Sequence, residues 1–260
     1  QVDPAFWREL RAFTHARRPD CWLVGEIIHG DYRAWANPAM FDSVTNYECY
    51  KGLWSSLVDG NYYEIAYALN RQFGEGGLYV DLPLYAFADN HDVDRVASKL
   101  TQPEHLFPLY VLLFTMPGVP SIYYGSEWGI PGAKTNGSDH PLRPHLDLGD
   151  MIDNGPHPDL VGTIAQLARI RRNSTALRFG SYQQVHIAHE QLAFVRQGGD
   201  ETILVVLNAA ADPVALEVEL PVEGRELVDL LNPGDRFPVH HRRAKLDPVW
   251  SNWARVLRVE

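Results

Sequence analysis

The sequence is poor in the residues that form covalent cross-links. Its 260 residues include only two cysteines, Cys21 and Cys49, and their separation matches no metal-ligand spacing. We therefore expect two free thiols, buried or half-buried, rather than a disulfide.

Long hydrophobic runs and an excess of positive charge are also missing. The longest apolar stretch, residues 109–124, contains two prolines and falls short of the roughly 20 residues that a membrane-spanning helix needs. Asp and Glu outnumber Lys and Arg by 33 to 23, and this net charge of −10 disfavours binding to a phosphate backbone. We expect neither a membrane nor a nucleic-acid partner.

What the sequence does contain is an alternation of strand-like and helix-like segments. The apolar runs are residues 21–26, 41–46, 84–92 and 119–127, and the helical patterns are residues 5–18, 47–60, 62–74, 104–118 and 159–174. This order predicts a parallel α/β sheet whose strands end in polar residues. In a (β/α)₈ barrel such ends form the active face, and four units make half a barrel.

The texture of the sequence changes after Leu177. Alternating β-branched and polar residues, separated by Gly-Gly-Asp and Asp-Pro turns, predict a small antiparallel β-sandwich over residues 178–260. The expected fold is α/β plus all-β, with residues 1–177 as the half barrel.

Two of the expected strand ends carry carboxylates, Glu26 and Asp92. Cleavage of a glycosidic bond needs a proton donor at the leaving oxygen and negative charge beside the sugar ring. Burial at the end of an apolar strand would keep Glu26 protonated, as an acid requires, whereas the polar neighbours of Asp92 favour its charged form. A single glutamate at a strand end is more often a helix cap or a surface acid than a catalytic residue. The cluster of polar residues at 90–95 is a stronger signal, because a structural role would have to explain four polar groups together.

Several motifs in the same order resemble those of the α-amylase superfamily, glycoside hydrolase family 13. WLVGE resembles its fifth-strand motif, FADNHDVDR its Asn-His-Asp motif and MPGVPSIYYGSEWGI its eighth-strand motif, while FDSVTNY resembles the sixth strand of the cyclomaltodextrinase, neopullulanase and maltogenic amylase group. LARIRRNSTALRFGSY resembles the link into the C-terminal β domain. The resemblance implies strands five to eight of a TIM barrel followed by a β-sandwich.

The resemblance also implies roles for the polar cluster. Glu26 matches the proton donor, and Asp92 matches the third carboxylate, which holds substrate hydroxyls and stabilises the transition state. His91 matches the histidine that binds the sugar in the −1 subsite, and Asn90 matches an amide with a supporting role. Arg95 lies where relatives often carry an arginine, for which a salt bridge and a substrate contact are equally good interpretations.

Other positions leave alternatives open. His29 either lines the leaving-group side or is a loop histidine. Ile27 replaces an aromatic residue that is frequent in the neopullulanase group, and the loop before the last helix lacks the usual Arg-Arg…Trp ending, so linkage preference is open. We interpret the scattered histidines His140, His145 and His157 as surface residues rather than metal ligands. We therefore expect no metal or cofactor in this chain.

The family's nucleophile is an aspartate in a Gly-x-Arg-x-Asp pattern at the end of strand four. QVDPAFWREL resembles the segment after that pattern, so we expect the nucleophile upstream of Gln1, with Asp3 as a helix N-cap. We expect a C-terminal fragment that is inactive alone; the loop domain in which relatives often bind calcium would lie in the preceding part. The uncovered half barrel would expose residues 22–24, 110–114 and 121–124 and self-associate.

The implied parent is a retaining α-glucan hydrolase that acts on α-1,4 bonds, with α-1,6 bonds and cyclic dextrins as further candidates. A transglycosylase of the superfamily, such as a trehalose synthase, an amylosucrase or a glucanotransferase, shares the same residues. A non-catalytic accessory relative would usually lose the acid and the Asn-His-Asp motif, both retained here. The compartment is unknown, although free cysteines and the neopullulanase resemblance favour the cytoplasm.

Overall fold

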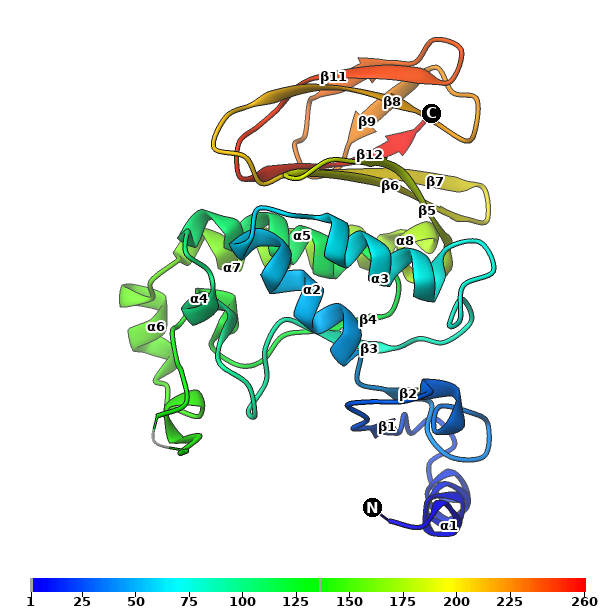
Figure 1. Cartoon of the computed structure of the whole chain (residues 1–260), viewed down its shortest axis with the longest axis vertical. Helices are drawn as coiled ribbons and strands as arrows, with labels where there is room; N and C mark the ends of the chain where they lie inside the picture. The colour runs from blue at the N-terminus through cyan, green and yellow to red at the C-terminus, as the bar shows by residue number, and fades with distance from the viewer. Residues whose placement is uncertain (1, 136) are drawn as a thin grey trace.

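The chain forms a helical layer between a β-sandwich and a short parallel sheet. The computed structural model describes residues 2–135 and 137–260. In Figure 1 the chain begins at α1, at the bottom, passes through β1 and β2 into the helices, and ends in the sandwich at the top.

The parallel strands are β1 (Val24–Gly25), β2 (Ser43–Val44), β3 (Tyr85–Phe87) and β4 (Val119–Ser121). β1 pairs with β2 and β3 pairs with β4, both in parallel, and a parallel bridge between Thr45 and Tyr85 joins the two pairs. The order β1-β2-β3-β4 confirms the predicted half barrel, with strands shorter than the apolar runs.

Helices and helical turns connect and cover these strands. The α-helices are α1 (Pro4–His15), α2 (Tyr47–Val58), α3 (Tyr63–Phe73), α4 (Val96–Lys99), α5 (Leu106–Thr115), α6 (Leu148–Asn154), α7 (Pro158–Asn173) and α8 (Thr175–Phe179). The 3₁₀ turns are η1 (Tyr32–Ala34), η2 (Pro103–His105), η3 (Ser126–Trp128) and η4 (His140–Leu142). Asp3 caps α1 by accepting a hydrogen bond from the Ala5 amide at 2.7 Å, which confirms its predicted role.

The C-terminal part is the predicted antiparallel sandwich. Its strands are β5 (Ser181–Ile187), β6 (Gln191–Gly198), β7 (Glu201–Asn208), β8 (Val214–Glu219), β9 (Glu226–Asp229), β10 (Arg236–Pro238), β11 (Arg243–Val249) and β12 (Trp253–Val259). Six of them form a sheet in the order β10-β9-β12-β7-β6-β5, and β11 pairs with β8. Buried residues such as Leu204, Leu246 and Leu257 fill the space between the two sheets.

The other face of the six-stranded sheet packs on the helices. α5 contacts α2, α7, β7 and β12, and all but one of its residues are buried. The expectation that residues 110–114 are partly uncovered is therefore wrong, because the helix-facing side of the six-stranded sheet and the neighbouring helices cover them. Since α8 spans the position between residues 177 and 178 and one core joins both sides, the domain boundary stays a prediction.

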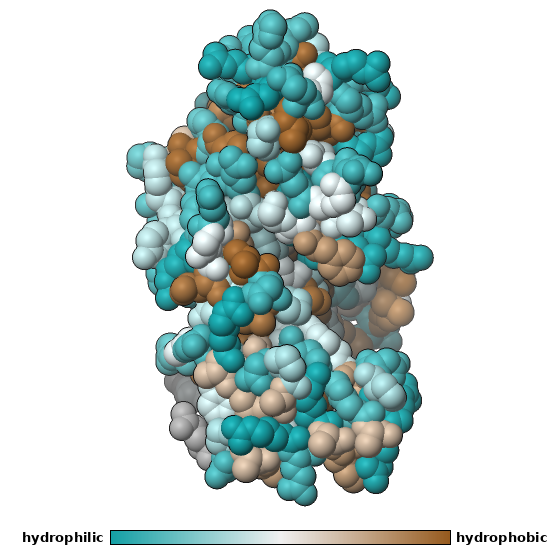
Figure 2. All heavy atoms as spheres, turned by 90° about the vertical axis from the view of Figure 1, so that its right-hand side faces the viewer, coloured by the Kyte–Doolittle hydropathy of each residue, from teal (hydrophilic) through white to brown (hydrophobic). Residues whose placement is uncertain are grey.

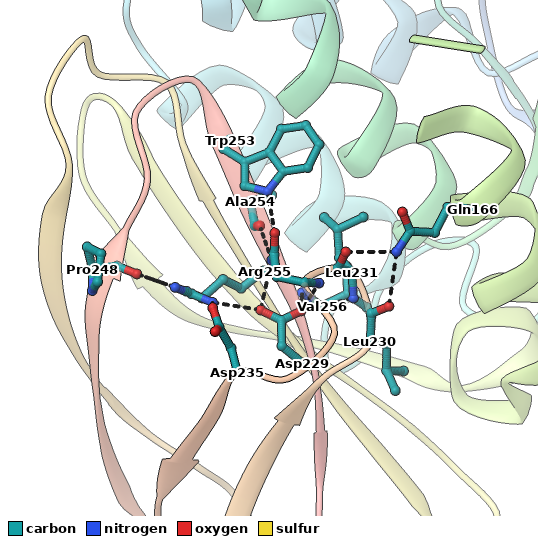
Figure 3. A network of polar contacts seen from close by, with 11 residues as sticks. Gln166, Asp229, Leu230, Leu231, Asp235, Pro248, Trp253, Ala254, Arg255 and Val256 are labelled. Carbon is teal, nitrogen blue, oxygen red and sulfur yellow. Dashed lines mark hydrogen bonds and ion pairs between the residues drawn. The ribbon is translucent and has the colours of Figure 1, made fainter. Parts of the chain in front are cut away.

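A polar network secures this junction. Gln166 of α7 donates from Nε2 to the carbonyl oxygens of Leu230 at 3.3 Å and Leu231 at 2.7 Å. Figure 3 shows the Arg255 guanidinium pointing toward the carboxylate of Asp229 beside these carbonyls. The pair is 2.9 Å apart and both side chains are buried, so the network ties the loop after β9 to α7 and β12.

The opposite end of the molecule is much less covered. None of the residues of α1 is buried, and Phe6 and Phe13 are 51% and 57% exposed. Trp22 and Val24 are also exposed, in agreement with the expectation that residues 22–24 are left uncovered. In Figure 2 hydrophobic residues are interspersed with hydrophilic ones over the lower part of the molecule, where α1 and β1 lie.

Across residues 2–135 and 137–260, every helix is too short or too polar to cross a lipid bilayer.

Candidate active site

The carboxyl ends of β1, β2 and β3 bring three sequence segments together. Glu26 follows β1, Tyr47 lies just beyond β2, and Asn90 lies just beyond β3. The hydroxyl of Tyr47 donates to Oε1 of Glu26 at 2.9 Å and accepts from Nδ2 of Asn90 at 3.2 Å. The two motifs predicted to carry chemistry are thus linked through one tyrosine.

Asn90 shapes the turn that presents Asp92. Its Oδ1 accepts hydrogen bonds from the backbone amides of Asp92 at 2.8 Å and Val93 at 3.1 Å. Such a side chain-to-backbone turn orients the residues that follow the strand. Asn90 therefore has a supporting position in the structure.

The carboxylate of Asp92 lies between two nitrogen-bearing side chains. His91 Nε2 is 3.3 Å from Oδ2, and Arg143 Nη2 is 3.1 Å from Oδ1. The same Arg143 nitrogen lies 2.6 Å from Asp139. Because the side chains of His91, Asp92 and Arg143 are all about half exposed, they remain accessible to a ligand.

Glu26 borders an open hollow. A cavity of about 540 Å³ is lined by Glu26, His29, Trp35 and Phe41 among others. An adjacent groove of about 920 Å³ is lined by His29 and Tyr47. Glu26 is exposed in this chain, so the burial expected at its strand end is absent. His29 lines the same cavity as the acid, and within the described residues no side-chain hydrogen bond or ion pair of His29 decides between its two interpretations.

Arg95 is not placed to contact a substrate. The residue is fully buried, and its guanidinium donates to the carbonyl oxygens of Tyr124 at 2.7 Å and Leu142 at 2.9 Å and to Ser126 Oγ at 3.2 Å. Its Cζ lies 4.5 Å from the ring centroid of Tyr123. The predicted substrate contact is wrong, because these contacts turn the guanidinium into the protein and away from the site.

Beneath the site, Ser126 connects Arg95 to a buried carboxylate. Its hydroxyl lies 2.9 Å from both oxygens of Asp89, which also accepts the Val96 amide at 2.9 Å. Burial raises the pKa of Asp89 above its ordinary value, against the opposing effect of these hydrogen bonds and of Arg95. This polar cluster packs the segments after β3 and β4 against each other.

Desolvation also affects the central tyrosine. Burial raises the pKa of Tyr47, and the hydrogen bond to Glu26 and the negative charges of Glu26 and Asp92 raise it further, whereas the bond from Asn90 lowers it. Tyr47 therefore keeps its proton at neutral pH and acts as a donor to Glu26.

Tyr47 and Arg143 are the site residues that sequence reasoning missed. Tyr47 closes the segment FDSVTNY, and the rule that polar residues follow strand ends would have included it. Arg143 lies in the loop after η4, where no periodicity or motif marks it. Only the fold brings it to Asp92.

Among the described residues, we find no group of three or more His, Cys, Asp or Glu side chains positioned to bind a metal ion.

Comparison with known proteins matches both parts of the chain. Residues 2–177 match the family model of the α-amylase catalytic domain, and residues 182–253 match that of the maltogenic amylase C-terminal domain. The cyclomaltodextrinase of Geobacillus thermopakistaniensis is 28% identical over 244 residues, covering 91% of this chain and 40% of that protein. Neopullulanase 2 of Thermoactinomyces vulgaris is 29% identical over 236 residues, covering 86% of this chain and 38% of that protein.

The fold matches solved structures over its whole length. The α-amylase of Geobacillus thermoleovorans in complex with acarbose superposes with a TM-score of 0.83 at 22% identity, covering 100% of this chain and 57% of that one. At this identity the match shows the fold alone. The chain spans 40% and 38% of the length of the two curated relatives described above.

Proposed function

This chain belongs to the α-amylase family, and on that premise we propose that it forms the C-terminal part of a retaining glycoside hydrolase acting on α-glucans. The observation that supports the proposal most is the hydrogen-bonded link from Glu26 through Tyr47 to the Asn90 turn. It places the proposed acid, Glu26, and the segment that carries Asp92 at one edge of the sheet, where both could contact the same sugar substrate.

In this proposal Glu26 protonates the leaving glycosidic oxygen and later accepts a proton from the attacking water. Asp92 binds sugar hydroxyls and stabilises the positive charge that develops on the ring, with His91 as a further hydrogen-bond partner. The nucleophile that forms the glycosyl-enzyme bond is assigned to a residue outside the printed sequence. The mechanism requires no cofactor from this chain.

The proposed substrates are α-1,4-linked glucans, with α-1,6 bonds and cyclic dextrins as further substrates. The relatives named cyclomaltodextrinase and neopullulanase support this class. The transglycosylase alternative uses the same two carboxylates, since it differs only in whether water or a sugar accepts the glycosyl group.

The test compares the 260-residue chain with the longer protein that contains the preceding barrel strands. We expect hydrolysis of maltodextrin and cyclodextrin only by the longer form, because loss of the nucleophile abolishes covalent catalysis. Glu26→Gln in the longer form should abolish the activity, with Glu48→Gln as the control. Transfer products in place of reducing sugar would indicate the transglycosylase, and an inactive longer form would favour the accessory alternative.

We also propose that the isolated chain self-associates through its uncovered end. Phe6, Phe13, Trp22 and Val24 are all exposed there. Burial of apolar surface between two copies would remove these side chains from water.

A further inference from the structure

The orientation of the Asn90 amide determines the direction of the hydrogen bonds around Glu26. Two backbone amides, those of Asp92 and Val93, point at one atom of the Asn90 side chain. Backbone amides only donate, so this atom is the carbonyl oxygen Oδ1 and the other is the Nδ2 donor. Nδ2 therefore donates to the Tyr47 hydroxyl at 3.2 Å.

The Tyr47 hydroxyl has a single proton to give. Having accepted from Asn90, it directs this proton to Oε1 of Glu26 at 2.9 Å. When Glu26 is protonated, Oε1 remains occupied as the acceptor of this bond. Protonation of the other oxygen, Oε2, leaves this bond intact, whereas protonation of Oε1 would bring two protons to one oxygen.

The fold holds Tyr47 rigidly in this position. Its ring lies edge-on to Phe87, with centroids 5.0 Å apart, and edge-on to Tyr50 at 5.8 Å. The preceding residue, Asn46, is fully buried; it caps α2 through the Cys49 amide and exchanges hydrogen bonds with Gln72. Neither the ring nor the backbone of Tyr47 can turn without loss of these contacts.

We propose that Tyr47 is a positioning residue that assigns the proton of Glu26 to Oε2 and so presents one defined oxygen to the glycosidic bond. This inference rests on the proposed role of Glu26 as the acid. It goes beyond that role because it explains how a glutamate that is exposed in this chain acquires a defined proton position.

The first test measures the coupling without any catalysis. In the 260-residue chain with ¹³Cζ-labelled tyrosine, Tyr47→Phe identifies the Tyr47 signal. Glu26→Gln removes the charged acceptor and its negative charge, both of which raise the pKa of Tyr47, so this pKa should fall toward its ordinary value of 10.0. The matched control is Glu48→Gln, because Glu48 pairs with Arg71 rather than with Tyr47. Equal shifts in both variants, or none in Glu26→Gln, would overturn the proposal.

The second test uses the longer, active protein and two matched substitutions. Tyr47→Phe removes the hydroxyl and keeps the ring, whereas Tyr50→Phe removes the hydroxyl of a neighbouring ring that stacks on Phe87 at 5.1 Å. We expect Tyr47→Phe to lower kcat on maltodextrin about 10–100-fold with little change in KM and to move the alkaline limb of the pH–rate profile. Tyr50→Phe should change neither.

A change of leaving group distinguishes two causes of a lower kcat in Tyr47→Phe, namely loss of acid positioning and general structural damage. An aryl maltoside releases a phenolate that needs little protonation, so the loss in Tyr47→Phe should be several-fold smaller with it than with maltodextrin. Equal losses on both substrates would contradict the proposal. If the unmodified longer protein cleaves neither substrate, the proposed hydrolase function fails, and the tyrosine titration still decides whether Tyr47 and Glu26 are coupled.

Discussion

Arg143 Nη2 lies 3.1 Å from Asp92 Oδ1, although 51 residues separate the two in sequence. The loop after η4 thus supplies a cation to the carboxylate that is proposed to hold sugar hydroxyls. Because the two side chains are 45% and 44% exposed, water screens this ion pair. The ion pair should therefore contribute little to the stability of the fold. Its effect should be confined to the position and charge of the Asp92 carboxylate.

We therefore expect Arg143→Ala to change the free energy of unfolding by less than about 1 kcal/mol. Urea denaturation measures this, with Arg143→Lys as the variant that keeps the charge. A decrease of several kcal/mol in the free energy of unfolding would show that the Arg143–Asp92 contact stabilises the fold as well as lining the site.

Arg95 should behave in the opposite way. Arg95→Met would leave the buried carbonyl oxygen of Leu142 and the partly buried one of Tyr124 without their donor, at a cost of about 1–3 kcal/mol for each group. We expect urea denaturation to show a loss of about 3 kcal/mol or more, with Arg143→Ala as the exposed-arginine control. A stable Arg95→Met variant with weakened sugar binding would restore the substrate-contact interpretation.

Asp89 makes stability depend on pH in a defined direction. Its pKa is raised in the folded protein above the ordinary value of 3.8, so the folded state binds the proton more tightly than the unfolded state. The resulting stability is fully present below 3.8 and is lost as the pH rises through the folded value. Relative to Asp89→Asn, the unmodified chain should therefore lose stability from pH 3.8 upward. Urea denaturation over a pH series measures the two free energies of unfolding, and an unmodified chain that gains stability relative to Asp89→Asn as the pH rises would show that the sign is wrong.

The buried ion pair within the C-terminal β-sandwich gives a matched comparison. Arg255 Nη1 lies 2.9 Å from Asp229 and 2.7 Å from Asp235, whose side chains are 0% and 46% exposed. Asp229→Asn leaves a buried guanidinium with less charge compensation and should cost about 3–5 kcal/mol, whereas Asp235→Asn should cost about 1 kcal/mol or less. Thermal or urea unfolding distinguishes them, and equal costs would mean that burial does not control this network (Figure 3).

Self-association should depend on the exposed face of α1. Phe6→Ser and Phe13→Ser together are expected to shift the chain toward a monomer in light scattering at micromolar concentration, because they remove apolar area from that face. Tyr67→Ser is the control, since Tyr67 is 70% exposed on α3. A monomeric unmodified chain would refute the self-association proposal.

The sequence by itself determined the order of elements and the identity of the two carboxylates. Apolar runs, helical periodicity and the polar residues at strand ends are local patterns, so Glu26, Asn90, His91 and Asp92 could be located without a structure. The same locality explains Asp3, whose cap bond joins residues two positions apart.

The tertiary structure decided which side chains meet. Tyr47 joins Glu26 to Asn90 only because parallel strands end at one sheet edge, and Arg143 reaches Asp92 only because the loop after η4 folds back over it. Local patterns also could not predict which of these side chains are buried. Arg95 is buried and Glu26 is exposed, although both follow apolar strands in the sequence. Burial of a side chain depends on contacts with segments that are distant in the sequence, so the spacing of nearby residues does not predict it.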